Sequence, residues 1–188
     1  MQKSVILIIL DGWGLSKEKR GNAVLQAKTP NMDYYWSYFP RTQLLTHGRY
    51  AGLPPNQVGN SEAGHMNLGA GRIVLQDSVY ISESIKDKTF FKNTAFIEAI
   101  KHIKKYKTKL HLIGLLSGEG SPHVSQDHIY ALLELARREK IQPVILHLFT
   151  DGRDSSQHGA IKFLKKLRGH FQNGEVVGSI VGRFYAMD

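Results

Sequence analysis

Apolar residues along the chain form short runs and helical stripes, and the two patterns alternate from residue 93 onward. Apolar runs of strand length occupy residues 109–116, 143–149 and 176–181. Apolar side chains recur at helical spacing over three further segments, residues 93–107, 124–140 and 155–171. Strands that alternate with such helices favour right-handed crossovers. We therefore predict an α/β fold, with a largely parallel sheet and flanking helices.

The first 75 residues follow a less regular pattern. Residues 4–10 form a continuous apolar, β-branched run, which is typical of a strand covered on both faces. Residues 31–39 predict a short helix, and residues 42–46 predict a second strand. The Gly- and Pro-containing residues 47–72 predict a long loop of the kind that often carries function. We place a domain boundary near residue 75, after this loop.

Composition excludes several classes of protein. The chain has 188 residues and no cysteine, so disulfide scaffolds, zinc ribbons and thiol catalysis are excluded. Its longest apolar run, residues 5–10, is far shorter than the roughly 18 residues of a membrane-spanning helix. The run also lacks the flanking features of a secretory signal. We expect a cytoplasmic chain without a membrane partner.

The chain is basic, with 25 Lys+Arg against 16 Asp+Glu and a formal net charge of +9. The excess is spread along the sequence, and its densest part, residues 101–109, lies around the end of a predicted helix, where cations favour the helix dipole. No aromatic-interleaved basic stretch accompanies it. We therefore expect no nucleic-acid partner, whereas small anionic substrates benefit from the same field.

Two polar positions in the first 75 residues are candidates for chemistry. Asp11 follows the first predicted strand, at the end where parallel α/β proteins bind ligands. A turn or helix cap is the alternative for this carboxylate. Residues 59–65 have the glycine spacing of a phosphate loop but lack its Lys-Ser/Thr. Ser61 within them is placed to begin a helix, where backbone N–H groups stabilise an oxyanion, or it simply caps that helix.

Further candidates follow the later strands. Arg153 and Arg183 each follow a predicted strand, and a guanidinium binds carboxylate or phosphate bidentately. His123 lies in a polar segment after another strand, and Asp154 neighbours Arg153. The alternatives are a neutral surface histidine and a cap for the helix predicted from residue 155. Together the strand ends favour a phosphorylated acid as substrate.

Four blocks occur in a fixed order along the chain: residues 11–14 (DGWG), 59–65 (GNSEAGH), 147–154 (HLFTDGRD) and 182–188 (GRFYAMD). They resemble the cofactor-independent (2,3-bisphosphoglycerate-independent) phosphoglycerate mutases of the alkaline-phosphatase superfamily, and the resemblance spans essentially the whole chain. It implies interconversion of 3-phosphoglycerate and 2-phosphoglycerate in glycolysis and gluconeogenesis. In this family a serine carries the phosphoryl group, and two Mn²⁺ or similar ions assist.

The resemblance also assigns roles to individual positions. Ser61 is implied as the nucleophile and, with Asp11, as a metal ligand. The residues implied to bind the glycerate and its phosphate are His123, Arg153, Asp154 and Arg183. Residues 1–75 correspond to the first piece of the metal-binding phosphatase domain, and residues 76–188 to part of an inserted transferase domain.

The chain also departs from the family pattern. In residues 117–125 one residue is inserted, and Ser125 stands where the family has a second histidine. Family chains are more than twice as long, and their remaining metal ligands lie in the later part. We therefore expect an incomplete, inactive portion of the enzyme, with the missing C-terminal portion as its partner.

Two alternatives to this interpretation remain. One is a non-catalytic, truncated module that binds phospho-acids, or half of a split enzyme. The other is a different phosphomutase or hydrolase of the alkaline-phosphatase type. The blocks at residues 150–154 and 182–188 disfavour the latter, because they belong to the transferase insertion.

Overall fold

The structure is a computed structural model, and it describes residues 4–118, 121–172 and 174–187. It divides into two compact units, Met1–Thr46 and His47–Asp188. The domain boundary near residue 75 concerns the family's domains and stays a prediction. Within the described residues, no helix combines the length and apolar character that crossing a membrane requires.

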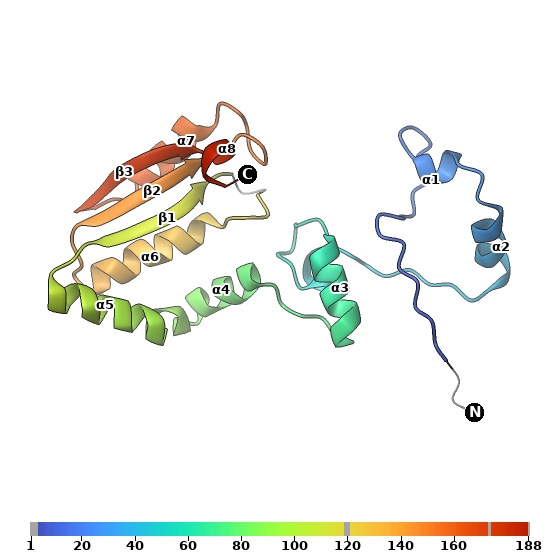
Figure 1. Cartoon of the computed structure of the whole chain (residues 1–188), viewed down its shortest axis with the longest axis horizontal. Helices are drawn as coiled ribbons and strands as arrows, with labels where there is room; N and C mark the ends of the chain where they lie inside the picture. Colours follow the sequence, from blue (N-terminus) through green and yellow to red (C-terminus); the bar gives the residue numbers. More distant parts are fainter. Residues whose placement is uncertain (1–3, 119–120, 173, 188) are drawn as a thin grey trace. The chain divides into compact units, whose positions relative to one another are not determined.

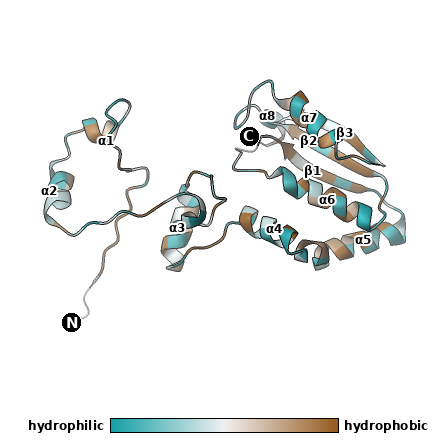
Figure 2. Cartoon of the chain, turned by 180° about the vertical axis from the view of Figure 1, so that it is seen from behind, coloured by the Kyte–Doolittle hydropathy of each residue, from teal (hydrophilic) through white to brown (hydrophobic). Residues whose placement is uncertain are grey.

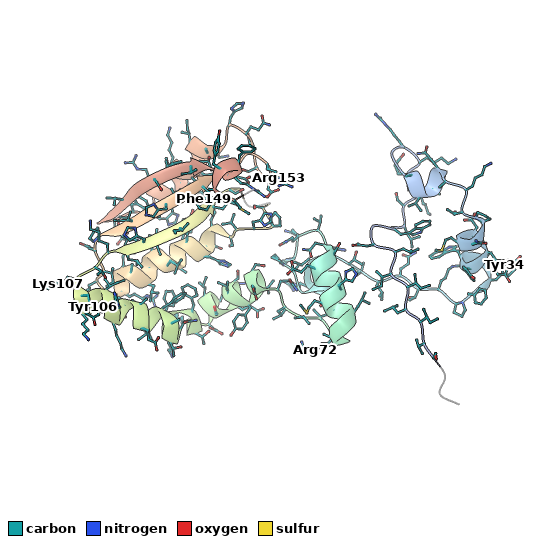
Figure 3. The ribbon with its side chains drawn as sticks, viewed as in Figure 1. Tyr34, Arg72, Tyr106, Lys107, Phe149 and Arg153 are labelled. Carbon is teal, nitrogen blue, oxygen red and sulfur yellow. The ribbon has the colours of Figure 1, made fainter. Side chains whose placement is uncertain are left out.

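In its described residues, 4–46, the first unit contains two short helices and little buried surface. They are α1 (Ala23–Gln26) and α2 (Pro30–Tyr38), and neither contains a buried residue. The helix predicted at residues 31–39 is confirmed as α2, which begins at a proline, as the fixed φ of that residue favours. Tyr34 on α2 is 54% exposed and points away from its ribbon (Figure 3).

The two strands predicted in the first unit are wrong. Residues 4–10 and 42–46 are irregular, and the apolar side chains of the first run are exposed, as in Val5 at 92%. A strand needs a neighbouring strand to satisfy its backbone N–H and C=O groups. The described part of this unit supplies none, so the apolar run stays unpaired.

The second unit carries the regular structure (Figure 1). Its first half is helical: η1 (Gly48–Ala51), α3 (Ser61–Ala70), α4 (Asp77–Lys86), η2 (Thr89–Lys92) and α5 (Thr94–Tyr106). Strands and helices then alternate: β1 (Leu110–Leu116), α6 (Gln126–Arg138), β2 (Val144–Thr150), α7 (Ala160–Arg168), β3 (Glu175–Gly182) and α8 (Arg183–Ala186). The expected loop at residues 47–72 thus contains η1 and the whole of α3.

The three strands form a parallel sheet in the order β1-β2-β3 (Figure 1). Helix α6 connects β1 to β2, and α7 connects β2 to β3. The α/β fold with a parallel sheet is therefore confirmed. Its parallel direction brings the carboxyl ends of all three strands to one edge of the sheet.

The core lies between one face of the sheet and the helices α5, α6 and α7. Leu146 and Leu148 of β2 are almost fully buried, as are Leu133 of α6 and Leu167 of α7. Each such leucine contributes about 1.5–3 kcal/mol by leaving water. Figure 2 shows hydrophobic and hydrophilic bands alternating along these helices, as amphipathic packing requires.

Helix α7 differs from its prediction in length, and one residue of its apolar stripe is exposed. It begins at Ala160, whereas the pattern predicted a start at residue 155. Ile161, one of the apolar residues at helical spacing in the segment 155–171, is 68% exposed, whereas Phe163 packs against the core. Residues 155–159 contain a bend and a turn and are not helical.

Candidate functional site

Three polar side chains meet at the carboxyl ends of the strands. Ser117 follows β1, Asp151 follows β2, and Arg183 follows β3. All are buried: Ser117 is 0% exposed, and the side chains of Asp151 and Arg183 are 1% and 5% exposed. Since polar groups are buried at a cost unless they are paired, their partners define the site.

Arg183 joins two carboxylates. Its Nη1 lies 3.2 Å from Oδ1 of Asp151 and 2.5 Å from Oδ2 of Asp154. His123 extends the group, with Nε2 3.7 Å from the same Oδ2 of Asp154. These four residues, with Ser117, are called the strand-end cluster below.

Asp151 is held by several hydrogen bonds within the strand-end cluster. It accepts hydrogen bonds from the Ser117 hydroxyl, from Arg183, and from the backbone N–H groups of Arg153 (3.0 Å) and Asp154 (3.3 Å). Burial by itself raises the pKa of this carboxyl, but the hydrogen bonds outweigh it and hold the pKa well below its usual range. Asp151 is therefore a fixed anion that orients Arg183.

A second row of side chains supports the strand-end cluster from α6. The side-chain amide of Gln126 donates to the carbonyl of Ser117. The Tyr130 hydroxyl donates to Oε1 of Gln126 at 2.9 Å. Because Gln126 is the first residue of α6, this contact ties the helix start to the end of β1.

Three of the predicted site residues are thus brought together: His123, Asp154 and Arg183. Asp154 does not cap a helix, because α7 starts only at Ala160. Arg153 is exposed and lies next to the strand-end cluster, beyond the ends of the strands (Figure 3).

The sequence reasoning missed Asp151 and Ser117 as members of this group. Both follow directly on a buried apolar strand, Ser117 after Leu116 and Asp151 after Thr150. That position was itself the available signal, because a polar residue there must find a buried partner. Nothing in the sequence showed that Arg183 would be this partner.

Ser61 and Asp11 lie on other elements. Ser61 is the first residue of α3 and is exposed, while the preceding Asn60 caps the helix by accepting from the N–H of Ala63 at 2.9 Å. Ser61 is therefore not the cap. Asp11 begins a turn after residues 4–10, in the other compact unit.

The residues that the structure describes do not assemble a metal site for the ions that the resemblance implies. Over residues 4–118, 121–172 and 174–187, no group of three or more His, Asp or Glu side chains could hold an ion. Asp11 and Ser61 supply only one carboxylate and one hydroxyl. This donor set does not fit two divalent cations, which prefer six or more oxygen ligands or several imidazoles.

The charges of the strand-end cluster suit a polar, hydroxylated ligand better than an anion alone. Asp151 and Asp154 carry two negative charges against the single positive charge of Arg183. Arg153, at the rim, adds a second cation. The cluster can accept hydrogen bonds from hydroxyls through Asp154 and can hold an anionic group through Arg153.

Comparison with known proteins gives concordant matches. Residues 81–188 match the model of the "BPG-independent PGAM N-terminus" family. The 2,3-bisphosphoglycerate-independent phosphoglycerate mutase of Gracilaria tenuistipitata var. liui is 48% identical over 99% of this chain, and that of Aster yellows witches'-broom phytoplasma is 47% identical over 100%. A crystal structure of Leishmania mexicana phosphoglycerate mutase, determined at low cobalt concentration, superposes with a TM-score of 0.77 at 32% identity over 96% of the chain.

The matched proteins are longer than this chain. It spans 36% of each of the two curated relatives and 34% of the Leishmania chain. Activities of the whole relatives therefore do not pass to this chain by similarity alone.

Proposed function

Because the chain belongs to the family of 2,3-bisphosphoglycerate-independent phosphoglycerate mutases and corresponds to its N-terminal portion, we propose that it contributes the nucleophile and substrate-binding residues of that activity. The activity is the interconversion of 3-phosphoglycerate and 2-phosphoglycerate through a phosphoserine. One observation carries the proposal: Arg183 holds Asp154 beside His123. These are the positions that the resemblance assigns to glycerate binding.

Ser61 is the proposed phosphoryl acceptor. Its Oγ loses the hydroxyl proton and forms a bond to phosphorus as the bond to one glycerate oxygen breaks, and that oxygen takes up a proton. The reverse step returns the phosphoryl group to the other hydroxyl of the retained glycerate. The start of α3, a helix of 10 residues, supports this role because its N–H groups and dipole favour negative charge.

The strand-end cluster is the proposed glycerate site. Asp154 accepts a hydrogen bond from a glycerate hydroxyl, and His123, at 46% side-chain exposure, reaches the same ligand from the other side. Arg153 binds the carboxylate or the phosphate. Asp151 is too deeply buried to touch substrate, so it acts by fixing Arg183. Holding the glycerate while its hydroxyls exchange places is the positioning contribution to catalysis.

The family is metal-dependent, while the described residues of this chain lack a fitting ligand set. We therefore propose that the chain by itself is inactive, and that activity needs the portion of its relatives that it does not span. The two Mn²⁺ or similar ions belong to that longer protein in this proposal.

The test joins this chain to the remaining portion of the phytoplasma relative and couples mutase turnover to enolase. We expect Mn²⁺-dependent turnover that chelator abolishes and that Ser61→Ala lowers by roughly a thousandfold or more. Ser78→Ala, on α4, is the matched control and should keep full activity. Undiminished turnover in Ser61→Ala would overturn the assignment.

A second candidate function is a non-catalytic module that binds phospho-acids, or half of a split enzyme. The incomplete ligand set among the described residues favours this candidate. Calorimetric titration of the unmodified chain with 3-phosphoglycerate, together with the turnover assay, separates the binding module from the mutase proposal. If Arg153→Ala weakens the binding of 3-phosphoglycerate and the joined protein shows no turnover, the result supports the non-catalytic module.

A further inference from the structure

The face of the sheet that lies opposite the core carries two histidines in direct contact. His111 is on β1 and His147 on β2, and the rings stack with centroids 5.2 Å apart and an interplanar angle of 13°. Nδ1 of His111 lies 2.9 Å from Nε2 of His147. Neither residue belongs to the strand-end cluster.

The strand register explains why the two rings meet. His147 pairs with Ile113, and His111 pairs with Ile145, so the histidines are diagonal neighbours on one face. This face is little covered: Ile113 is 70% exposed, and His111 is exposed as well. Solvent and small ions therefore reach His111 directly.

Strand β3 completes the arrangement through a bulge. The register shifts by one residue between Leu146 and His147, which turns Ser179 to the same face as His147. Oγ of Ser179 lies 2.8 Å from Nδ1 of His147. Gly178 leaves the room for this, because a Cβ there would stand 2.5 Å from Cγ2 of Ile145 and 3.3 Å from Cε1 of His147.

We propose that His111 and His147 form a two-histidine site for a divalent transition metal such as Zn²⁺. Imidazole nitrogens are preferred ligands of Zn²⁺. Ser179 acts as the outer partner that metal-binding histidines usually have: it accepts from Nδ1–H of His147 and so leaves Nε2 to bind the ion. Water completes the coordination.

Two changes are needed for both nitrogens to bind one ion: the nitrogens move slightly apart, and the His111 ring turns so that its Nδ1 points at the ion instead of at Nε2 of His147. Two nitrogens at about 2.0–2.1 Å from a tetrahedral ion lie about 3.3 Å apart, roughly 0.4 Å more than the present separation. The exposed His111 ring can supply this movement, while Ser179 holds His147. For a neutral pair the proton between the rings moves through solvent to Nε2 of His111. No net proton is released.

The test follows the histidine ring nitrogens of the metal-free, isotope-labelled chain by nuclear magnetic resonance during Zn²⁺ titration. We expect saturable shifts at Nδ1 of His111 and Nε2 of His147, and no response to Mg²⁺, which prefers oxygen. His111→Ala should weaken this binding more than tenfold. Ser179→Ala should weaken it about 10–100-fold, whereas His102→Ala, an exposed histidine on α5, should leave it unchanged.

The outcomes are decisive for the site. Loss of the response in His111→Ala, with native far-ultraviolet circular dichroism, supports it even where His147→Ala does not fold. The proposal is overturned if Zn²⁺ leaves both rings unshifted, or if His111→Ala binds Zn²⁺ as the parent does. This test is independent of mutase activity, so its failure leaves the proposed function untouched.

Discussion

Two apolar runs of the same character have opposite fates in this chain. Residues 4–10 (SVILIIL) and β2 (VILHLFT) are both β-branched and of strand length. The first is irregular and exposed, whereas β2 is hydrogen-bonded on both sides and carries the buried Leu146 and Leu148. The difference lies in the neighbours and not in the runs themselves. Helices α6 and α7 return the chain so that β1 and β3 flank β2, while nothing in the described part of the first unit does so for residues 4–10.

The strand-end cluster is built from residues at the ends of the strands, and the described part of the first unit has no strands. Substitution in this cluster should therefore give the largest difference in lost stability between the two units. Arg183→Met leaves Asp151 and Asp154 without their shared cation, and we expect a loss of about 3–5 kcal/mol in the free energy of unfolding. The matched change in the first unit is Arg41→Met, where an exposed guanidinium lies 5.2 Å from the Trp36 ring. That variant should lose less than about 1 kcal/mol. Urea unfolding checks both, and equal losses would show that the cluster does not stabilise the sheet.

Core substitutions compare the two apolar runs directly. Leu146→Ala removes a side chain that is 0% exposed, and the cavity should cost about 2–5 kcal/mol. Ile8→Ala removes one that is 76% exposed and should stay within about 0.5 kcal/mol. Urea unfolding again provides the measurement. A large loss in Ile8→Ala would mean that residues 4–10 are buried in solution, and the two apolar runs would then not differ in burial.

These differences also explain how much of the fold the sequence could predict. The patterns for α2, α5, α6 and the three strands were sufficient, because each element's own periodicity reports the face that it buries. Helix α4 was missed: its apolar residues form only a weak stripe, and it packs against α6, far along the sequence. The strand at residues 4–10 was predicted wrongly for the converse reason, since pairing depends on partners that a local pattern does not report.

The candidate site was predictable to a similar degree. His123, Asp154 and Arg183 could be chosen as candidates from the sequence because they follow predicted strands and match positions of the family. The contacts among these residues could not be predicted, because they depend on where Asp151 and Arg183 meet in space. The structure brings these three together, but the roles of all six predicted site residues rest on the resemblance and stay predictions.

Acid titration gives the next largest effect and again concerns the second unit alone. The folded pKa of Asp151 is depressed, so its stabilising contribution is present above the unfolded pKa of about 3.9 and is lost as the pH falls below it. Asp151→Asn should lose about 1–3 kcal/mol at pH 7. The difference between the parent and this variant should shrink as the pH falls from 5 toward 2. Urea unfolding at several pH values checks this, and a pH-independent difference would contradict it.

The smallest predicted effect concerns His128, which sits where α4 contacts α6. Its Nε2 lies 2.9 Å from Oγ of Ser82. Burial is the main cause that lowers the pKa of His128, against the opposing effects of the Asp127 charge and a hydrogen bond with the Ser78 backbone. The folded unit therefore favours the neutral ring, and the unfolded chain takes up a proton first. This stabilising contribution is present above about pH 6.5 and is lost as the pH falls through the lowered folded value.

Urea unfolding at pH 7.5 and 5.5 should show a smaller acid-induced loss of stability in His128→Gln than in the parent. His102→Gln, whose ring is exposed on α5, should follow the parent. If His128→Gln and the parent lose the same amount of stability, protonation of this ring does not affect the packing of α4 on α6. The pH dependence of the second unit then arises at Asp151 and the other carboxylates.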